Sequence, residues 1–371
     1  MKQTINSIIN KIENNKIPIS NYFISVAALF LLRILFESFS DGDAIRPLTV
    51  MHYFLWFLAV SLSVLIIFLF IAKENIIKIT KLILFSWAIV LIAPLIDLIL
   101  TRGAGFNISY LTPGFHDNLI SRYFTFFGAS NGMGVSLGIK IELAIILLFS
   151  FYYFYLKTRN ILKSIFGIWI FYSMLFIFAT VPFWIKWFLE ALNIFAGYSE
   201  LLAVRVNLLL GFILLLILLW IKFKKYFIII IKDFRWMRVA HYVLMFILGI
   251  VLANADLNSL LTETKFFEFI FAMLALLMAI LFSIITNNLA DIKIDKLTNQ
   301  DRPLVKNLIP IKEYKKLAYI SVIFAVIFSL AANFKTFFVI MLFAGNFFLY
   351  SMEPFRFKRV TLISELATSL N

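Results

Sequence analysis

The side chains best suited to chemistry lie in residues 287–310, which read NNLADIKIDKLTNQDRPLVKNLIP directly after an apolar segment. On a helix, Asn288, Asp291 and Asp295 are spaced i, i+3 and i+7 and project from one face, with Asn287 beside them. Carboxylate and amide oxygens suit Mg²⁺, an ion that keeps several waters and bridges to substrate phosphates. The pattern therefore predicts a magnesium site with Asn288, Asp291 and Asp295 as ligands.

A helix that leaves a membrane also needs a polar end, so an isolated DxxxD more often marks a helix terminus than a metal site. A second polar stretch changes this weighing. Residues 350–359 read YSMEPFRFKR and again follow an apolar segment. Two such stretches at the ends of neighbouring apolar segments favour one shared site over two unrelated helix ends.

Together the two stretches resemble the UbiA superfamily of intramembrane prenyltransferases, over about residues 232–371. The family's first Asp-rich motif, NDxxDxxxD, is matched at Asn287, Asn288, Asp291 and Asp295, with Asn instead of Asp at its second position. The family's Arg-Pro pair is matched by Arg302-Pro303. Its YSxPPxRxK-like segment is matched, with Glu353 at the first proline position, by Tyr350, Ser351, Pro354, Arg356 and Lys358.

The resemblance implies Mg²⁺-dependent transfer of a polyprenyl group from its diphosphate to an acceptor that the sequence does not identify. The metal would be held by Asn288, Asp291 and Asp295. Substrate would be bound by Asn287, Lys306 and Ser351. Catalysis would use one tyrosine, as a donor to the leaving diphosphate, and three cations, through charge-assisted bonds to phosphate oxygens: Tyr350, Arg302, Arg356 and Lys358. Ionisation would give an allylic cation, stabilised by electrostatics and aromatic faces in a dry pocket.

The sequence also departs from the family pattern. Family members have about nine transmembrane helices and a second Asp-rich motif, but no second DxxxD follows Tyr350 before Asn371. Three alternatives stay open: the region is truncated, a second chain completes it, or this copy is not an active transferase. A different class of function is then a non-catalytic membrane scaffold or a lipid-carrier-binding subunit that pairs with another chain.

Composition fixes the broad class. Hydrophobic residues make up 63% of the chain and the mean hydropathy is +0.97, well above soluble domains. The net charge of +14 is better explained by basic cytoplasmic loops of a membrane protein than by nucleic-acid binding. The chain has no Cys, which excludes disulfides and Cys-based metal sites. Residues 1–20 lack the pattern of a cleaved signal peptide, so the first apolar segment is expected to be a retained anchor.

Runs of about 20 apolar residues predict an all-α, polytopic membrane helix bundle of about ten transmembrane helices. Pro94 and Pro182 predict kinks in the third and fifth spans. The expected spans are residues 21–36, 52–72, 83–100, 137–156, 164–185, 201–221, 239–254, 266–286, 317–332 and 336–352.

Loop charge predicts the orientation of these spans. With a cytoplasmic N-terminus, 25 of the 34 Lys and Arg residues lie in cytoplasmic segments and 5 lie in the opposite loops. This bias predicts a multi-pass protein of the cell membrane, in contact with membrane lipids, with the Asp-rich stretch on the cytoplasmic side.

A boundary is expected within residues 222–238, which are basic and aromatic and contain a short Ile run. That run is too short to span a membrane and could lie in the interface, held by anionic headgroups, or lead directly into the seventh span. The sequence thus predicts a six-helix region of unknown role, residues 1–231, followed by a UbiA-like region, residues 232–371.

Several ionisable residues of the first region lie within or near the ends of spans, where charges are costly and are functional candidates: Arg33, Glu37, Asp97, Lys140, Glu142, Lys186 and Arg205. Arg33 and Glu37 could pair at i, i+4. Asp97 could meet Lys140 or Arg205, whereas snorkelling to the interface is the simpler interpretation for Lys186. In the predicted outer loops, Asp41-Gly42-Asp43 and His116-Asp117 are weak candidates that more often mark surface turns.

Overall fold

The computed structural model describes residues 2–41, 46–103, 110–111, 118–128, 135–194, 199–253, 262–360 and 365. These residues form helices and contain no β-strand. The chain divides into two compact units. The N-terminal unit comprises Met1–Leu192 with Gly197–Leu218, and the C-terminal unit comprises Asn193–Ala196 with Leu219–Asn371. The division falls inside one helix rather than at residue 231.

Nine helices of the described residues are long and apolar enough to cross a membrane, and a shorter apolar helix, Trp236–Leu252, corresponds to the seventh expected span. The prediction of a polytopic helix bundle is therefore confirmed. The nine spans are Ile19–Phe36, Pro47–Ala72, Ile76–Leu100, Leu137–Thr158, Ile161–Ala179, Glu200–Asp233, Thr264–Ala290, Ile311–Ala332 and Phe334–Ser351.

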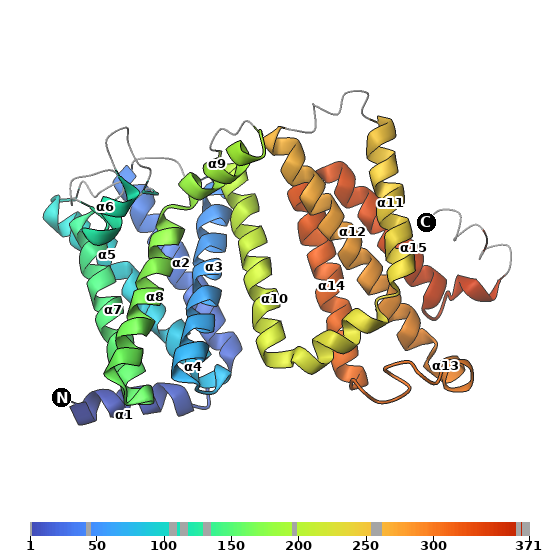
Figure 1. Cartoon of the computed structure of the whole chain (residues 1–371), viewed down its shortest axis with the longest axis horizontal. Helices are drawn as coiled ribbons and strands as arrows, with labels where there is room; N and C mark the ends of the chain where they lie inside the picture. The colour runs from blue at the N-terminus through green and yellow to red at the C-terminus, as the bar shows by residue number, and fades with distance from the viewer. Residues whose placement is uncertain are drawn as a thin grey trace. The chain divides into compact units, whose positions relative to one another are not determined.

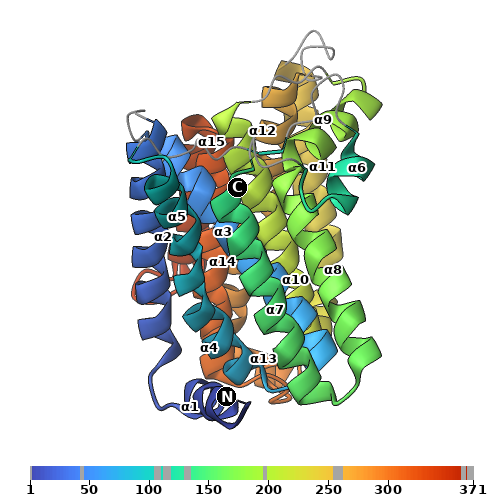
Figure 2. The same cartoon turned by 90° about the vertical axis from the view of Figure 1, so that its left-hand side faces the viewer.

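In the N-terminal unit, a bundle of long helices stands over a short amphipathic helix, α1, that lies across its lower end (Figures 1 and 2). Asn75 and Asn160 each accept from a backbone N–H of the helix that follows and so fix where α4 and α8 begin. The elements are α1 (Lys2–Asn14), α2 (Ile19–Asp41), α3 (Pro47–Ala72), α4 (Ile76–Ser86), η1 (Trp87–Leu91), α5 (Ile92–Leu100), α6 (Leu119–Phe124), α7 (Leu137–Thr158), α8 (Ile161–Ala179) and α9 (Val181–Ala191).

Both predicted kinks are present. The third span changes to a 3-10 turn at η1 shortly before Pro94, and the fifth ends at Ala179, just before the helix that contains Pro182. A proline removes one backbone donor and crowds the preceding turn, which accounts for both interruptions.

α10 (Glu200–Asp233) bends at Phe223, whose φ/ψ of −124° and 31° are not helical. Beyond the bend, the Ile run packs its Ile229 and Ile230 on the buried side chains Ile285, Leu304 and Ile309. The run is therefore part of a helix that packs on the core of the C-terminal unit.

The C-terminal unit is built on α12 (Glu263–Ala290), which packs against α14 (Ile311–Ala332) and α15 (Phe334–Ser351), with α11 (Trp236–Ala253) also in contact (Figure 1). The helices α12 and α14, which pack on each other, both carry small buried residues: Ala272, Ala275, Ala279, Ala318, Ser321 and Ala325. Small side chains let apolar helices approach closely in a membrane. The short helix α13 (Ile292–Thr298) and the turn η3 (Phe357–Arg359) follow α12 and α15.

Candidate functional site

The predicted metal-binding stretch lies where α12 ends. The helix does not continue straight through it, because Asp291 has φ/ψ of −98° and 6° and separates α12 from α13. The Asp291 N–H donates to the Asn287 carbonyl at 3.0 Å, and the Asp295 N–H donates to the Asp291 carbonyl at 2.8 Å. Asn288 and Asp291 therefore remain one turn apart on α12, whereas Asp295 belongs to the next helix. The expectation of one helical face for all three is corrected by this break.

Asp291 receives two cations from the second predicted stretch. Its Oδ1 pairs with Arg356 Nη2 at 3.0 Å and with Lys358 Nζ at 2.5 Å. The chain turns back after Ser351, and Arg356, with a φ of 38°, precedes the turn η3. Left-handed backbone is uncommon outside glycine. The turn brings both cations onto one carboxylate, so the two stretches that suggested a shared site do meet.

Asn288 lies in a second, buried cluster. Its side-chain nitrogen donates to Asp233 Oδ2 at 2.7 Å and to the Tyr314 hydroxyl at 3.0 Å, and its oxygen accepts from Arg235 at 2.8 Å. Asp233 also accepts from Tyr314 at 3.1 Å and pairs with Arg302 at 2.9 Å. With both ends of its amide engaged, Asn288 holds these groups in place beside Asp291.

Sequence reasoning missed Asp233 and Arg235. They flank the junction of α10 and α11, where Arg235 has a φ of 49°. One signal could have found them, since Asp233 is the only acidic residue between Lys222 and Arg238, in a run of six basic ones. A lone carboxylate among cations at a helix end is well placed to organise them.

Two buried donors at this site have no acceptor among the described residues. They are the Nε atoms of Arg235 and Arg356. Burial, followed by the nearby positive charges of Arg302 and Arg238, lowers the pKa of the Arg235 guanidinium from its ordinary value. Buried N–H groups are nearly always paired in proteins, and an unpaired one calls for an explanation such as a water or an ion. An oxyanion would supply acceptors to both.

The remaining predicted residues contribute unequally. Asp295 is buried, accepts from Asn299 at 3.0 Å and interacts electrostatically with Arg235. Ser351 donates to Asn287 at 3.4 Å and so ties the end of α15 to α12. Tyr350 is half-buried next to it.

Lys306 pairs with Asp301 at 2.6 Å on an exposed part of the loop. This hydrogen bond lowers the pKa of Asp301. Lys306 is thus the predicted binding residue whose ion pair lies outside the two clusters.

Oxygen donors from carboxylates and amides fit the ligand preference of Mg²⁺. The residues that the structure describes contain no group of three or more His, Asp or Glu placed to hold a metal ion by themselves. These donors therefore fit an ion that one or two carboxylates hold together with substrate phosphates, which is the usual mode of Mg²⁺ binding. An ion caged by protein alone does not fit this set.

The charged residues of the N-terminal unit have other partners than expected. Arg33 pairs with Glu142 at 3.1 Å, and the side chain of its expected partner, Glu37, lies outside the described residues. Asp97 accepts from Ser136 and, at 3.0 Å, from the Gly138 N–H, so it caps the start of α7 and does not pair with Lys140 or Arg205.

Lys140 donates to the carbonyl of Gly128. Lys186 is exposed near Glu190, at 3.7 Å, in keeping with its simpler interpretation. The weaker candidates at Gly42, Asp43, His116 and Asp117 lie outside the described residues.

Comparison with known protein families gives a match for one region of the chain. Residues 242–370 match the model of the UbiA prenyltransferase family. This match confirms the resemblance drawn from the two polar stretches and covers the end of α12, the following loop and the turn after α15. It supports a membrane function of the prenyltransferase type. Neither the curated proteins nor the solved structures that were searched gave a match. Asp233 and Arg235 precede the matched UbiA region.

Proposed function

We propose that the C-terminal unit is a prenyltransferase of the UbiA type, which binds a polyprenyl diphosphate and Mg²⁺ at the end of α12. The observation that carries the proposal is the pair of buried, unpartnered Nε–H groups on Arg235 and Arg356. They occur in a site where five basic side chains meet four carboxylates: Arg235, Arg302, Arg356, Lys358 and Arg359 against Asp233, Asp291, Asp295 and Glu353. Unused donors and surplus positive charge favour a multiply charged anion.

Each cluster would have its own role. In the cluster around Asp233, Arg302 and Arg235 would bind phosphate oxygens, while Asn288 and Tyr314 keep them in place. In the other cluster, Asp291 would exchange its contacts to Arg356 and Lys358 for the metal, and the released cations would turn to the diphosphate. Mg²⁺, when bound, would neutralise charge that develops on the leaving diphosphate. Asp295 would be a further oxygen donor, behind the break in the helix.

The isoprenoid chain needs an apolar surface next to the site. Tyr242 of α11 packs edge-on against Phe343 and Phe347 of α15, with ring centroids 5.4 and 6.3 Å apart. These rings lie within two turns of Tyr350 along α15. Aromatic faces there would pack against the chain and stabilise an allylic cation through their π electrons. Tyr350, which is half-buried near the end of α15, would donate to the departing diphosphate.

The test is binding of radiolabelled farnesyl diphosphate and a longer polyprenyl diphosphate to the full chain in nanodiscs, with Mg²⁺ or with EDTA. We expect Mg²⁺ to strengthen binding at least tenfold. In Asp291→Ala, and to a smaller extent in Asp295→Ala, the ratio of the two affinities should approach one, because the variant lacks a carboxylate that holds the ion. Arg356→Met should weaken binding under both conditions.

Lys293→Ala is the matched control, since Lys293 is exposed on α13 between the two acids. It should leave both affinities nearly unchanged. Binding of equal strength in Mg²⁺ and EDTA would contradict the proposal. So would an equal loss of affinity in Lys293→Ala and Asp291→Ala. The motif would then be interpreted as a polar helix end.

A further inference from the structure

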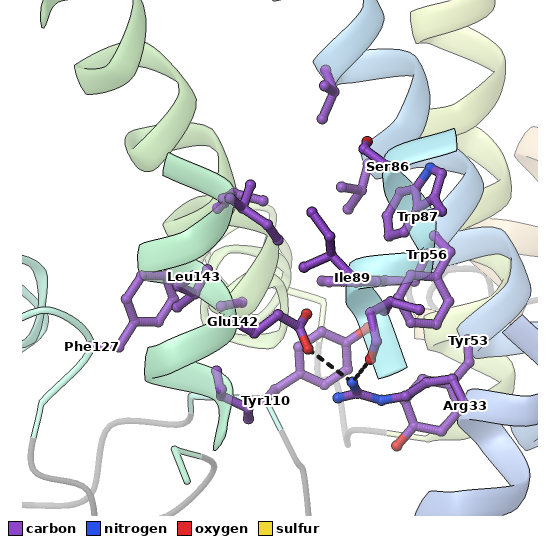
Figure 3. A pocket seen from close by; sticks show the side chains of 18 of the residues that line it. Arg33, Tyr53, Trp56, Ser86, Trp87, Ile89, Tyr110, Phe127, Glu142 and Leu143 are labelled. Carbon is purple, nitrogen blue, oxygen red and sulfur yellow. Dashed lines mark hydrogen bonds and ion pairs between the residues drawn. The ribbon is translucent and has the colours of Figure 1, made fainter. Parts of the chain in front are cut away.

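The N-terminal unit, to which neither the family match nor the proposed function assigns a role, encloses a cavity of about 410 Å³. Its walls are formed by side chains of α2, α3, α4, η1, α7 and α8, with Tyr110, Leu111, Phe127 and Glu200 completing it. The volume lies in the range of small-molecule sites, roughly 300–1,000 Å³. Figure 3 shows Arg33, Tyr110 and Glu142 near one end of the cavity and Ser86 and Trp87 farther along it.

Most polar groups of the cavity come from the first two turns of their helices, and Arg33 comes from within α2. Arg33 donates to the Val90 carbonyl and pairs with Glu142, whose carboxylate also accepts from the Ala93 N–H at 3.2 Å. Glu200, the first residue of α10, accepts from Thr49 at 3.0 Å.

His52 is hydrogen-bonded to the Tyr110 hydroxyl and stacks on Tyr53 at 5.2 Å. The cavity wall thus carries two carboxylates, Glu142 and Glu200, and one guanidinium, Arg33, which is already paired with Glu142. This end of the cavity is rich in hydrogen-bond acceptors and has no surplus of positive charge.

The rest of the wall is apolar and aromatic. Phe57 packs edge-on against Trp56 and Trp87, with ring centroids 5.1 and 5.4 Å apart. Beyond them lie aliphatic residues such as Val60 and Ile83. The Trp87 Nε–H is buried and has no acceptor among the described residues. It lies near the middle of the span Ile76–Leu100, where an unpaired donor is costly.

We infer that this cavity binds an amphiphile with an apolar body and a hydroxylated head that carries no negative charge. Hydroxyls donate to the carboxylates of Glu142 and Glu200 and accept in turn from a tyrosine hydroxyl, so they match both kinds of group at the polar end. The carbon-bound hydrogens of a hydroxylated ring would lie on the aromatic faces there.

A phosphate head does not suit the same end. It has acceptors but few protons to give at neutral pH, and two carboxylates would repel it. To neutralise the phosphate, the guanidinium of Arg33 would have to leave Glu142. The Glu142 carboxylate would then be unpaired at membrane depth, which is costly. The preferred ligand therefore differs in class from the diphosphate proposed for the C-terminal unit.

The experiment uses three photoreactive probes with the same alkyl chain and a glucoside, phosphate or trimethylammonium head. Each is cross-linked to the full chain in phosphatidylcholine nanodiscs, and the labelled peptides are found by mass spectrometry. We expect saturable labelling by the glucoside of peptides that contain Trp56 and Trp87, and at least tenfold weaker labelling by the phosphate. Tighter binding of the phosphate or of the trimethylammonium probe would overturn the assignment of the head.

Two variants locate the site. Glu200→Gln keeps the shape of the side chain but removes its charge, and it should weaken glucoside binding about tenfold, as expected for loss of a hydrogen bond to a charged group. Glu190→Gln is the control, because Glu190 is exposed on α9 outside the cavity. Ile89→Trp fills the cavity and should abolish saturable labelling, with the unfolding temperature checked in parallel. Equal binding by the Glu200 and Glu190 variants would overturn the proposal.

Discussion

At the scale of single residues, the site of the C-terminal unit is defined by how carboxylates and cations pair. Asn288 is the instructive position, since an amide stands where the UbiA motif usually has an acid. Its nitrogen lies 2.7 Å from Asp233, a distance that suits a donor and an acceptor and would place two carboxylates in repulsion. The nearby acid therefore explains how the amide fits this chain.

This pairing predicts the effect of Asn288→Asp. The variant should lower the unfolding temperature in EDTA by several degrees, because two buried carboxylates would then share one site. Mg²⁺ should recover most of the loss by binding between them. Unfolding in nanodiscs with and without Mg²⁺ measures both effects.

Asn299→Asp is the comparison, since Asn299 is exposed and contacts Asp295 at 3.0 Å without touching Asp233. It should show less destabilisation in EDTA. An Asn288→Asp variant whose unfolding temperature is unchanged in EDTA and does not rise with Mg²⁺ would contradict the role given to Asp233.

Much of this site was predictable, and the reasons for the gaps are physical. Asp291, Arg356 and Lys358 stand in motifs whose spacing is visible in the sequence. Asp233 and Arg235 are distant in sequence from Asn288 and reach it only because α10 bends at Phe223 and Arg235 adopts left-handed backbone. No periodic pattern encodes either feature. The break of the helix at Asp291 was missed because DxxxD suits a straight helix equally well.

At the scale of helices, α5 and α7 contact each other through a close approach of their backbones at Gly138, and not through an ion pair. A Cβ on Gly138 would lie 2.4 Å from the Ala93 carbonyl oxygen and 2.8 Å from Asp97 Cγ. Glycine is therefore required where the Asp97 carboxylate caps α7. The sequence predicted that Asp97 could pair with Arg205. In the structure its buried carboxylate instead accepts from the hydroxyl and N–H donors at the start of α7.

Gly138→Ala should consequently destabilise the protein by roughly 1–3 kcal/mol, as overpacking against rigid backbone does. The measurement is the unfolding midpoint in detergent. Gly211→Ala in α10 is the matched control, because nothing lies within 4 Å of its added Cβ. Helix propensity should make that variant neutral or more stable by up to about 1 kcal/mol. Destabilisation of the two variants to the same extent would refute the close-approach argument.

The short helix α1 is held to the bundle by an ionic cluster. Lys157 of α7 pairs with Glu13 of α1 at 2.8 Å and with Glu74 at 3.0 Å. The backbone N–H of Asn75, followed by Lys157, lowers the pKa of Glu74 from 4.5 to about 2. A lowered pKa in the folded state stabilises the fold above the unfolded value, and this contribution is lost as pH falls from 4.5 toward 2.

Hydrogen exchange of α1 in the full chain should therefore accelerate as pH falls through this window, after correction for the intrinsic rate. Glu74→Gln should remove most of that dependence and expose α1 already at neutral pH, whereas Glu190→Gln should not. Unchanged protection of α1 in the Glu74 variant would show that its apolar contacts alone hold it.

At the scale of the whole molecule, the remaining question is on which side of the membrane the proposed site lies. Loop charge predicts the cytoplasmic side. Within the C-terminal unit, α14 has 22 residues and so places its two ends about 33 Å apart, enough to cross the apolar core of a bilayer. Thr298 is exposed near the site, and Lys335 is exposed beyond the far end of α14.

The chain has no cysteine of its own, so single cysteines at these two positions report orientation without background. In intact cells, an impermeant maleimide should label Lys335→Cys and spare Thr298→Cys, and permeabilisation should expose Thr298→Cys. A diphosphate made in the cytoplasm could then reach Arg302 and Arg356 without crossing the membrane. Labelling of Thr298→Cys in intact cells would reverse the orientation, and labelling of both would show that α14 does not span the bilayer.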